Sequence, residues 1–461
     1  MPRRTLPYRT GRFRSRRLAP ISLAGAVALT AQLAIPANAM AASRTPISMW
    51  FFNLAAQDNF LQSGLKVFER QHPSYTINFQ DTAPPTGTGG LEDKLTAAFA
   101  TGSAPDIIPV ISTDADEYIS NHLLLPFTNA DAKLLGYSSV AGMESSFQTG
   151  VLAPWEMNGK VYAIPWQNST LDLACNTAPF KAAGINLAPY ANKTMTWSRF
   201  IKLGEQVVKA NPGHYYKNAS GQWVHNLLKL PIFQDDTWAM QVLTMFEAQA
   251  GGNVLNGKSV GVASKPSQVA VNEMKAISLD LGDPHLGPII PGDLFTAFAD
   301  NQTTCAMAGN FLQPLFMTSP PSPVVKHMVV LKMPTIYPGK IGNVAWGWAF
   351  GVNAKTPSSL VGPAWQAIKT TFDRPVQEVV QGGIMGPSDK HLDAAPALKS
   401  IVDLKTIEAN TAGAQPIFKS TQYPTIAHLL RGDLDAIMLS GAPVASTLQS
   451  AASQIASIVK S

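Results

Sequence analysis

The chain has little cysteine and little charge, and beyond its first 40 residues it has no long hydrophobic run. Cysteine occurs twice in 461 residues, as Cys175 and Cys305, and the eight histidines are scattered singly. No group of these residues has zinc-site spacing, so neither a metal centre nor a cofactor is expected. Charged residues make up 14% of the chain and hydrophobic residues 46%, which is typical of a globular protein. The lack of a second apolar run of spanning length argues against a membrane-embedded mature protein.

The N-terminus has the features of a secretory signal peptide. Residues 1–17 hold seven arginines and no acidic residue, an apolar run follows over 18–35, and an Ala-Asn-Ala cleavage pattern ends at Ala39. We therefore expect residues 1–39 to be removed on export, which leaves a periplasmic or secreted protein. A membrane anchor is the alternative, but the run is borderline in length and is interrupted by proline, glycine and glutamine. The sequence does not separate general secretory from twin-arginine export.

The basic character of the chain comes mostly from this segment. The full chain has 35 basic and 30 acidic residues, so removing the seven arginines leaves 28 against 30, a formal charge of −2. A nucleic-acid partner would need a basic face on the folded domain, and none is expected. Roughly 420 remaining residues exceed what one hydrophobic core usually supports, so the sequence predicts two lobes.

Strands and helices alternate along the mature chain. Continuous apolar or alternating runs predict strands, and apolar residues at helical spacing predict helices. Strands are expected at 47–52, 75–79, 107–111, 171–175, 303–308, 328–331 and 346–352; helices are expected at 58–71, 91–100, 197–209, 237–250, 269–281 and 446–460. Thr196 is a predicted N-cap, and Gly251 a predicted helix stop. This alternation indicates an α/β protein whose sheets are covered by helices.

Three short segments match the sequence motifs of functional sites but lack the neighbouring elements that those sites need. Residues 252–259 fit the G-x-x-x-x-G-K-S phosphate loop, but a helix is predicted before the loop and none after it. Residues 63–66 fit S-x-x-K without its companion elements. The acids at 114–117 lack the remaining ligands of a calcium loop. A pair of catalytic carboxylates could still meet in space, so an exported hydrolase stays open as an alternative.

Six blocks, in a fixed order along the chain, carry a family resemblance. They are Ala104–Val110 with Leu123–Pro126, Asn158–Trp166, Asn176–Gly184 with Thr196-Trp197, Gln249–Gly252, Cys305–Gly309, and Trp346–Asn353. From about residue 47 to residue 461 the chain resembles the family 1 extracellular solute-binding proteins, the group around the maltodextrin- and glycerol-phosphate-binding proteins. Two departures stand out. Cys175 replaces a tyrosine common in relatives, and Asn310-Phe311 replaces a segment where a tryptophan is frequent.

The resemblance implies a two-lobed periplasmic-binding-protein fold of type II, in which a solute is bound by closure of a cleft around hinge crossings. Crossings are expected near 166–170, 331 and 371. The N-terminal lobe would comprise residues 45–168 and 331–370, and the C-terminal lobe residues 169–330 and 371–461. It also implies a monomer that works with the permease subunits of an ABC importer and catalyses nothing. In an oxidising compartment a disulfide between Cys175 and Cys305 could persist, but the sequence does not show whether they meet, and two buried free thiols are the favoured interpretation.

The resemblance further implies a ligand site between the lobes. A sugar has hydroxyls and an apolar face, so its site combines aromatic platforms with amides and carboxylates. The positions that match the family's cleft are Asn53, Asp114, Trp166, Gln167, Asp236, Trp238, Asn310, Phe311, Trp346 and Tyr423. Each also has a structural interpretation: Trp166 could pack the hinge, and Asp236 could serve a helix N-terminus.

The expected ligand is a mono- or oligosaccharide. A glycerol-phosphate or polyol ligand is the alternative, but a phosphate would need an arginine or lysine clamp. Arginine is scarce after residue 39, and none falls in a block that matches the cleft. Trp346 and Trp348, two apart on one predicted strand, should share a face. We expect at most one of them to contact ligand.

Overall fold

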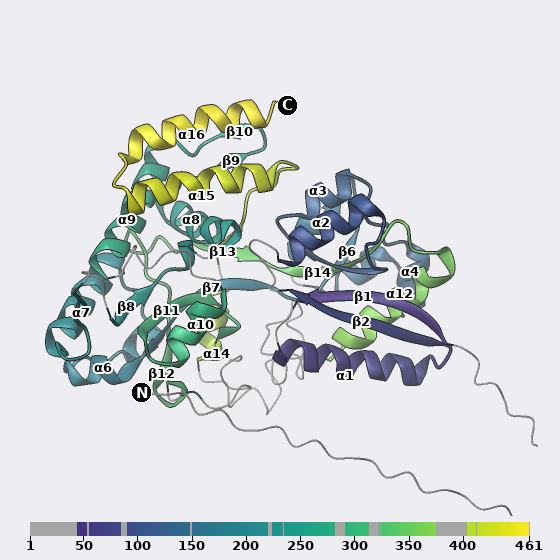
Figure 1. Ribbon diagram of the computed structural model, residues 1–461, viewed down its shortest axis with the longest axis horizontal. Coiled ribbons are helices and arrows are strands. Elements are labelled where there is room, and N and C mark those ends of the chain that lie inside the picture. The colour runs from purple at the N-terminus through teal and green to yellow at the C-terminus, as the bar shows by residue number, and fades with distance from the viewer. Residues whose placement is uncertain are drawn as a thin grey trace, which may run out of the picture. The chain divides into compact units, whose positions relative to one another are not determined.

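The chain is represented by a computed structural model, whose described residues form the unit that begins at Arg44 (Figure 1). The described ranges are 44–52, 55–83, 90–147, 150–219, 224–233, 235–281, 291–312, 322, 324–374, 403–411 and 413–460. The predicted signal peptide and Asn53 lie outside them. Among the described helices, none is long and apolar enough to cross a bilayer.

One lobe is built on a five-stranded sheet with the strand order β2-β1-β3-β14-β6. Its elements are β1 (Thr45–Phe52), α1 (Ala55–Gln71), β2 (Tyr75–Ala83), α2 (Leu91–Thr101), β3 (Ile107–Ile111), α3 (Ala115–Ser120), α4 (Asn129–Leu134), α5 (Val140–Glu144), β4 (Glu156–Met157), β5 (Lys160–Val161), β6 (Ala163–Pro165), β14 (Trp348–Val352) and α12 (Ser358–Phe372). The strands β1, β2 and β3 are parallel, whereas β14 runs antiparallel to β3 and β6. Figure 1 shows α1 on one side of this sheet and α2 on the other. Every residue of β3 is buried, as its continuous apolar sequence predicts.

The other lobe is built on a six-stranded mixed sheet, in which β7 pairs with β11, β12 and β13. Its elements are β7 (Ser169–Asn176), α6 (Thr177–Ala182), α7 (Trp197–Ala210), β8 (Asn226–Lys229), α8 (Asp236–Ala250), β9 (Leu255–Asn256), β10 (Ser259–Val260), α9 (Lys265–Asp280), α10 (Pro291–Ala299), β11 (Thr303–Gly309), β12 (Met328–Leu331), β13 (Asn343–Trp346), α14 (Leu404–Thr411), β15 (Ala414–Pro416), α15 (Tyr423–Leu439) and α16 (Val444–Ile458). All eight residues of β7 are buried. The two sheets have separate apolar cores, which confirms the predicted two-lobed α/β fold.

The local predictions at two helix ends are confirmed. The Thr196 hydroxyl accepts a hydrogen bond from the Arg199 N–H at the start of α7, and Gly251 ends α8 with φ of 81°. That left-handed conformation suits glycine, which lacks a Cβ. The phosphate-loop match leads into the β9–β10 hairpin and not into a helix. The feature that aims backbone N–H groups at phosphate is therefore missing.

The predicted strand over 346–352 is in fact two strands in two sheets. β13 ends at Trp346 and pairs with β7, while β14 begins at Trp348 and pairs with β3 and β6. The break lies at Gly347, where an added Cβ would lie 2.1 Å from the Gln167 carbonyl oxygen. Trp346 therefore packs in the core of one lobe and Trp348 in the other. The expectation that they share one face is wrong.

Two chain crossings lie side by side between the sheets. The β6-to-β7 segment runs antiparallel to the β13-to-β14 segment, and the Trp348 carbonyl accepts from the N–H groups of Trp166 and Gln167. The first of these segments joins β6, which ends at Pro165, to β7, which begins at Ser169. The second lies at 346–348, later than the predicted 331, because β12 and β13 both remain paired to β7. The third predicted crossing, near 371, falls in the last turn of α12; residues 375–402 lie outside the described residues.

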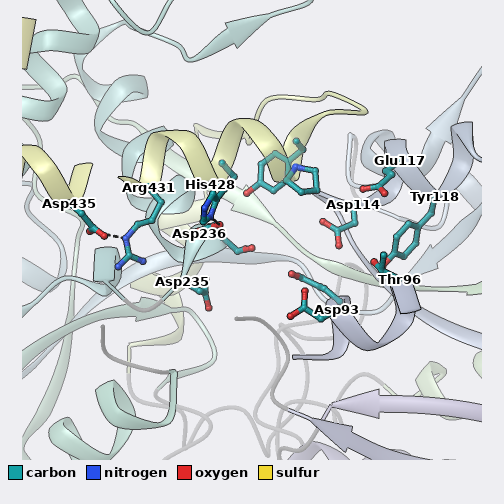
Figure 2. Close-up of a pocket in the computed structure, with 15 residues that line it drawn as sticks. Asp93, Thr96, Asp114, Glu117, Tyr118, Asp235, Asp236, His428, Arg431 and Asp435 are labelled. Atoms are coloured by element: carbon teal, nitrogen blue, oxygen red, sulfur yellow. Dashed lines mark hydrogen bonds and ion pairs between the residues drawn. The ribbon is translucent and has the colours of Figure 1, made fainter. Parts of the chain in front are cut away.

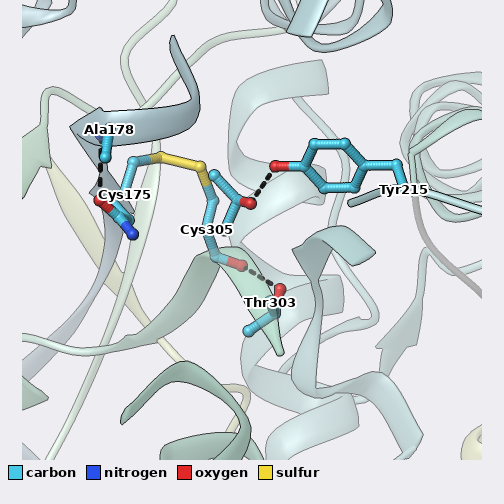
Figure 3. Close-up of a disulfide and its surroundings, with 7 residues drawn as sticks. Cys175, Ala178, Tyr215, Thr303 and Cys305 are labelled. Carbon is cyan, nitrogen blue, oxygen red and sulfur yellow. Dashed lines mark hydrogen bonds between the residues drawn. A yellow bond between two sulfur atoms is a disulfide. The ribbon is translucent and has the colours of Figure 1, made fainter. Parts of the chain in front are cut away.

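The two cysteines are joined by a disulfide between neighbouring strands (Figure 3). Cys175 on β7 and Cys305 on β11 are direct partners in the antiparallel register, and both are fully buried. The bond spans 130 residues of sequence. It joins two central strands of the second sheet, and the favoured interpretation of two buried free thiols is therefore wrong.

A carboxylic acid is buried in the middle of that same sheet. Asp172 on β7 is 2% exposed, and its Oδ1 accepts a hydrogen bond from Asn410 Nδ2 at 2.7 Å. The same Asn410 amide donates to the Leu331 carbonyl, and its oxygen accepts from the Met333 N–H. Burial raises the pKa of Asp172 to about 8, although the Asn410 hydrogen bond opposes the rise. The acid therefore holds its proton in the folded protein near neutral pH.

The buried Asp172 predicts a loss of stability as the pH rises. Between about pH 4 and 8 the unfolded chain ionises this group while the folded chain does not, so folding binds a proton and the free energy of unfolding falls with pH. Asp172→Asn keeps the Asn410 contact and removes the titration. Urea unfolding at pH 5 to 7.5 should show a slope smaller by up to about 1.4 kcal/mol per pH unit. Asp373→Asn, at an exposed acid, is the control; equal slopes for Asp172→Asn and the parent chain would refute the assignment.

Candidate functional site

A polar pocket of about 500 Å³ opens between the two lobes (Figure 2). One wall comes from α2 and α3 of the first lobe, and the other from the start of α8 and from α15 of the second lobe. The lining residues are Glu92, Asp93, Thr96, Asp114, Glu117, Tyr118, Asp235, Asp236, Thr237, Tyr423, Pro424, Ala427, His428, Arg431 and Asp435. Seven of them are carboxylic acids. A cavity of about 710 Å³ shares Asp93, Thr96, Glu117 and Pro424 with this pocket, so the space extends beyond one small solute.

The first-lobe wall is made by helices that begin near the sheet. Glu92 and Asp93 lie in the first turn of α2, and Asp114 occupies the N-cap position of α3 directly after the parallel strand β3. Loops at the carboxyl ends of parallel strands are where α/β folds place ligand sites. The described lining residues of this wall include four acids and no basic side chain.

The second-lobe wall is made by one helix start and one helix face. Asp235 caps α8, and its Oδ1 accepts from the Trp238 N–H at 2.8 Å. His428, Arg431 and Asp435 lie three and four residues apart on α15 and therefore share a face. Arg431 Nε donates to Asp435 Oδ1 at 2.9 Å, and His428 Nδ1 lies 3.1 Å from Asp236 Oδ2. Both basic side chains of the pocket thus have carboxylate partners on their own lobe.

Crowding and burial make several of these acids hard to ionise. The pKa of Glu92 is raised well above its usual value, first by burial and then by the charges of Asp114 and of Asp235 from the other lobe. Burial, together with Glu117, raises the pKa of Asp114 to about 7. Burial also raises the pKa of Glu117. The ionised forms of these acids are therefore unfavourable in the pocket, and a positively charged group beside them would favour ionisation.

Three of the predicted site residues meet in this pocket: Asp114, Asp236 and Tyr423. Asp114 comes from the first lobe and the other two come from the second. Tyr423 begins α15, is 2% exposed, and packs against Phe418. The structure thus brings residues more than 300 positions apart in sequence to one cavity.

Two other predicted residues line a second pocket at the hinge. Gln167 and Trp346 face a mostly apolar cavity of about 460 Å³, together with Trp155 and Ile417. Lys419 lines it too, donates to the Ala153 carbonyl at 2.9 Å and lies 3.4 Å from Asp116 Oδ1. Since Lys419 belongs to the second lobe and its partners to the first, these contacts tie the lobes together beside the hinge.

The remaining predicted residues lie in packing contacts. Trp166 is 1% exposed and stacks against Phe350 and Phe372, and Trp238 packs edge-on against Trp346. Asn310 donates to the Asn168 carbonyl beside the hinge. Phe311 contacts Phe295 edge-on. Asn53 lies outside the described residues.

Sequence reasoning missed most of the acids in the pocket. Glu92, Asp93 and Asp235 look like ordinary acids at helix starts, which the helix dipole favours. Only the adjacent acids Asp235 and Asp236 gave a sequence signal for this part of the pocket. Asp236 is among the predicted site residues, and Asp235 is not. Arg431 also lines the pocket although it lies outside the six matching blocks, because it is on the face of α15 that borders the pocket.

Two α/β lobes joined by adjacent crossings, with a polar cavity between them, define the architecture of a solute-binding protein. Solved structures share this fold. Maltose-bound MalE3 of T. maritima has a TM-score of 0.74 and 16% identity, over 89% of this chain and 99% of that one. UgpB of Mycobacterium tuberculosis, in complex with glycerophosphocholine, has a TM-score of 0.73 and 15% identity, over 91% and 99%. A solute-binding protein of Thermotoga lettingae bound with α-D-tagatose has a TM-score of 0.72 and 18% identity, over 90% and 100%.

The chain belongs to the family of bacterial extracellular solute-binding proteins, whose sequence profile matches residues 53–370. Membership confirms the resemblance seen in the six blocks. It also identifies the chain as a binding protein and not an enzyme. A search of curated proteins found no match.

The crowded acids predict that neutralising one of them stabilises the empty protein. At pH 8 Asp114 is ionised against its burial and against Glu117, so Asp114→Asn should raise the free energy of unfolding by about 2 kcal/mol. The asparagine oxygen can still accept from the Thr113 hydroxyl, as Asp114 Oδ1 does. Urea unfolding without solute measures the change. The gain should shrink as the pH falls from about 7 towards 4, and it should vanish only below the ordinary aspartate pKa, where the folded and unfolded chains are both protonated. A less stable variant at pH 8 would mean that the carboxylate is already well solvated.

Proposed function

We propose that this protein is the exported binding subunit of a bacterial ABC importer and that it captures a carbohydrate between its lobes. The observation that carries the proposal is the pocket itself, which draws hydrogen-bonding groups from both lobes across a two-segment hinge. A solute that contacts both walls favours the closed arrangement by its differential contacts. The permease subunits of the importer would be its protein partner, and a monomer leaves the lobes free to move.

Carbohydrate is favoured over phosphate-bearing solutes by the charge of the site. Sugar hydroxyls donate hydrogen bonds to carboxylates, and this pocket offers seven. A glycerol-phosphate ligand would instead need basic groups available to its oxygens. Structural neighbours are described as binding maltose, α-D-tagatose and D-mannitol, which supports a hydroxylated solute. The lobe boundaries that we propose, from strand pairing, are 44–166 with 347–373 for the first lobe and 167–346 with 404–461 for the second.

The carbohydrate proposal predicts thermal stabilisation by one or more sugars. A solute at a hundred times its Kd adds about 2.7 kcal/mol to the free energy of unfolding and should raise the Tm by a few degrees. The panel contains neutral and amino mono- and disaccharides, polyols and glycerol 3-phosphate. No shift with any sugar or polyol would overturn the assignment, and a shift with glycerol phosphate alone would favour the alternative.

Tyr423→Phe locates the binding in the pocket. It removes a hydroxyl from the pocket lining and leaves the ring, so the fold should persist while the affinity falls by about tenfold. Tyr337→Phe, at a tyrosine that is 45% exposed, is the matched control. Equal affinity in both variants would place the bound sugar elsewhere.

Export gives a separate prediction. If residues 1–39 form a cleaved signal peptide, the protein recovered from the periplasm or medium begins at Met40. Intact-mass measurement of the exported protein checks this. A mass that retains the arginine-rich segment would indicate an uncleaved anchor.

A further inference from the structure

Acidic side chains line both walls of the pocket, whereas its basic side chains, among the described lining residues, come from the second lobe alone. Binding of a neutral solute does not require this difference in charge. On the first-lobe wall, the described lining residues include the acids Glu92, Asp114 and Glu117 and no basic side chain. On the second-lobe wall, the Arg431 guanidinium is held by Asp435 and lies over the Phe233 ring, while His428 faces Asp236. The basic groups of the site are therefore committed within one lobe.

Helix dipoles do not call for this many acids. The starts of α2, α3, α8 and α15 meet the pocket, and the first three have acidic residues in the first turn or at the cap. Acids there offset the positive ends of the helices. However, the acids also repel one another across the cleft, because Asp235 and Asp236 raise the pKa of Glu92 from the opposite lobe. The favourable interaction with the helix N-termini therefore does not cancel the mutual repulsion of these carboxylates.

Two buried polar atoms in the pocket lack partners. Glu92 Oε1 is shielded from solvent and has no hydrogen-bond partner among the described residues. The Tyr423 hydroxyl, on a side chain that is 2% exposed, lies beside Thr237 and makes no hydrogen bond of ordinary geometry. Buried polar atoms are almost always hydrogen-bonded, so such atoms in a pocket indicate groups that a ligand completes. They lie on opposite walls, as a solute held by both lobes requires.

The described acids of the pocket are not arranged as a metal-ion site. Within the described ranges, no three histidine, cysteine or carboxylate side chains come close enough together to hold one. The acids are spread over a cavity of about 500 Å³, which suits an organic solute.

We propose that the solute carries a protonated amine on a hydroxylated body, as an amino sugar does, and that its ammonium group binds between Glu92 and Asp114. This inference rests on the proposed carbohydrate function. An ammonium group has three N–H donors and no acceptor, so it can pair with two carboxylates and still donate once more. Such charge-assisted hydrogen bonds are about twice as strong as neutral ones. The remaining hydroxyls can meet Tyr423 and the acids of α8.

Matched pairs of sugars test the charge directly. Titration calorimetry at pH 7.5 compares D-glucosamine with D-glucose, D-galactosamine with D-galactose, and the β-1,4-linked glucosamine disaccharide with cellobiose. N-acetyl-D-glucosamine keeps the nitrogen without its charge. We expect at least one amine to bind ten times more tightly than its neutral partner. The proposal is overturned if no amine in the panel does so, whether neutral sugars bind or not.

Glu92→Gln shows whether the preference comes from this site. The amide keeps the size of the side chain and removes its charge. It should weaken binding of the amine at least tenfold and leave its neutral partner within about threefold. Glu205→Gln, on the exposed face of α7, should change neither. An equal loss for amine and neutral sugar would show that Glu92 contacts only hydroxyls, and would refute the charge-specific role.

The outcomes separate the two proposals. Neutral sugars that bind as well as their amines leave the carbohydrate function standing and refute the amine. Failure of every sugar, charged or neutral, refutes both.

Discussion

The structure depends on two chain segments that pass between the sheets in contact with each other. The β6-to-β7 and β13-to-β14 segments run antiparallel, and the Trp348 carbonyl binds the N–H groups of both Trp166 and Gln167. Gly347 permits this approach, because any side chain there would meet the Gln167 carbonyl. These two connections lie on adjacent strands, and each lobe keeps its own apolar core, as a hinge between two lobes requires.

This arrangement explains why charge collects in the cleft. Helices α2, α3 and α8 begin at the cleft, and acids at their starts are locally favourable. Brought together across the hinge, the same acids repel one another, and burial raises the pKa of Glu92 and Asp114. Ionising these acids is therefore unfavourable, and a positively charged group between them would reduce that cost. Lys419, which reaches Ala153 and Asp116 on the first lobe, opposes that repulsion beside the hinge.

The sequence predicted the fold better than the site. The continuous apolar run over 107–111 reads as a buried strand because both faces of β3 are covered, and Thr196 and Gly251 mark helix ends through local geometry alone. The long-range features were not predictable in the same way. The pairing of Cys175 with Cys305 depends on the register of β7 and β11, and Trp166 looks like a sugar platform until its phenylalanine neighbours are placed. Glu92 carries no signal in the sequence that separates it from any acid in a first helical turn.

Closure around the hinge is the claim on which the account depends most. Small-angle X-ray scattering of the protein, alone and saturated with the sugar that gives the largest thermal shift, measures it in solution. The account predicts a smaller radius of gyration with bound sugar, because a solute held by both walls draws the lobes together. An unchanged radius at saturation would contradict it, and would mean that the sugar binds without contact to both lobes.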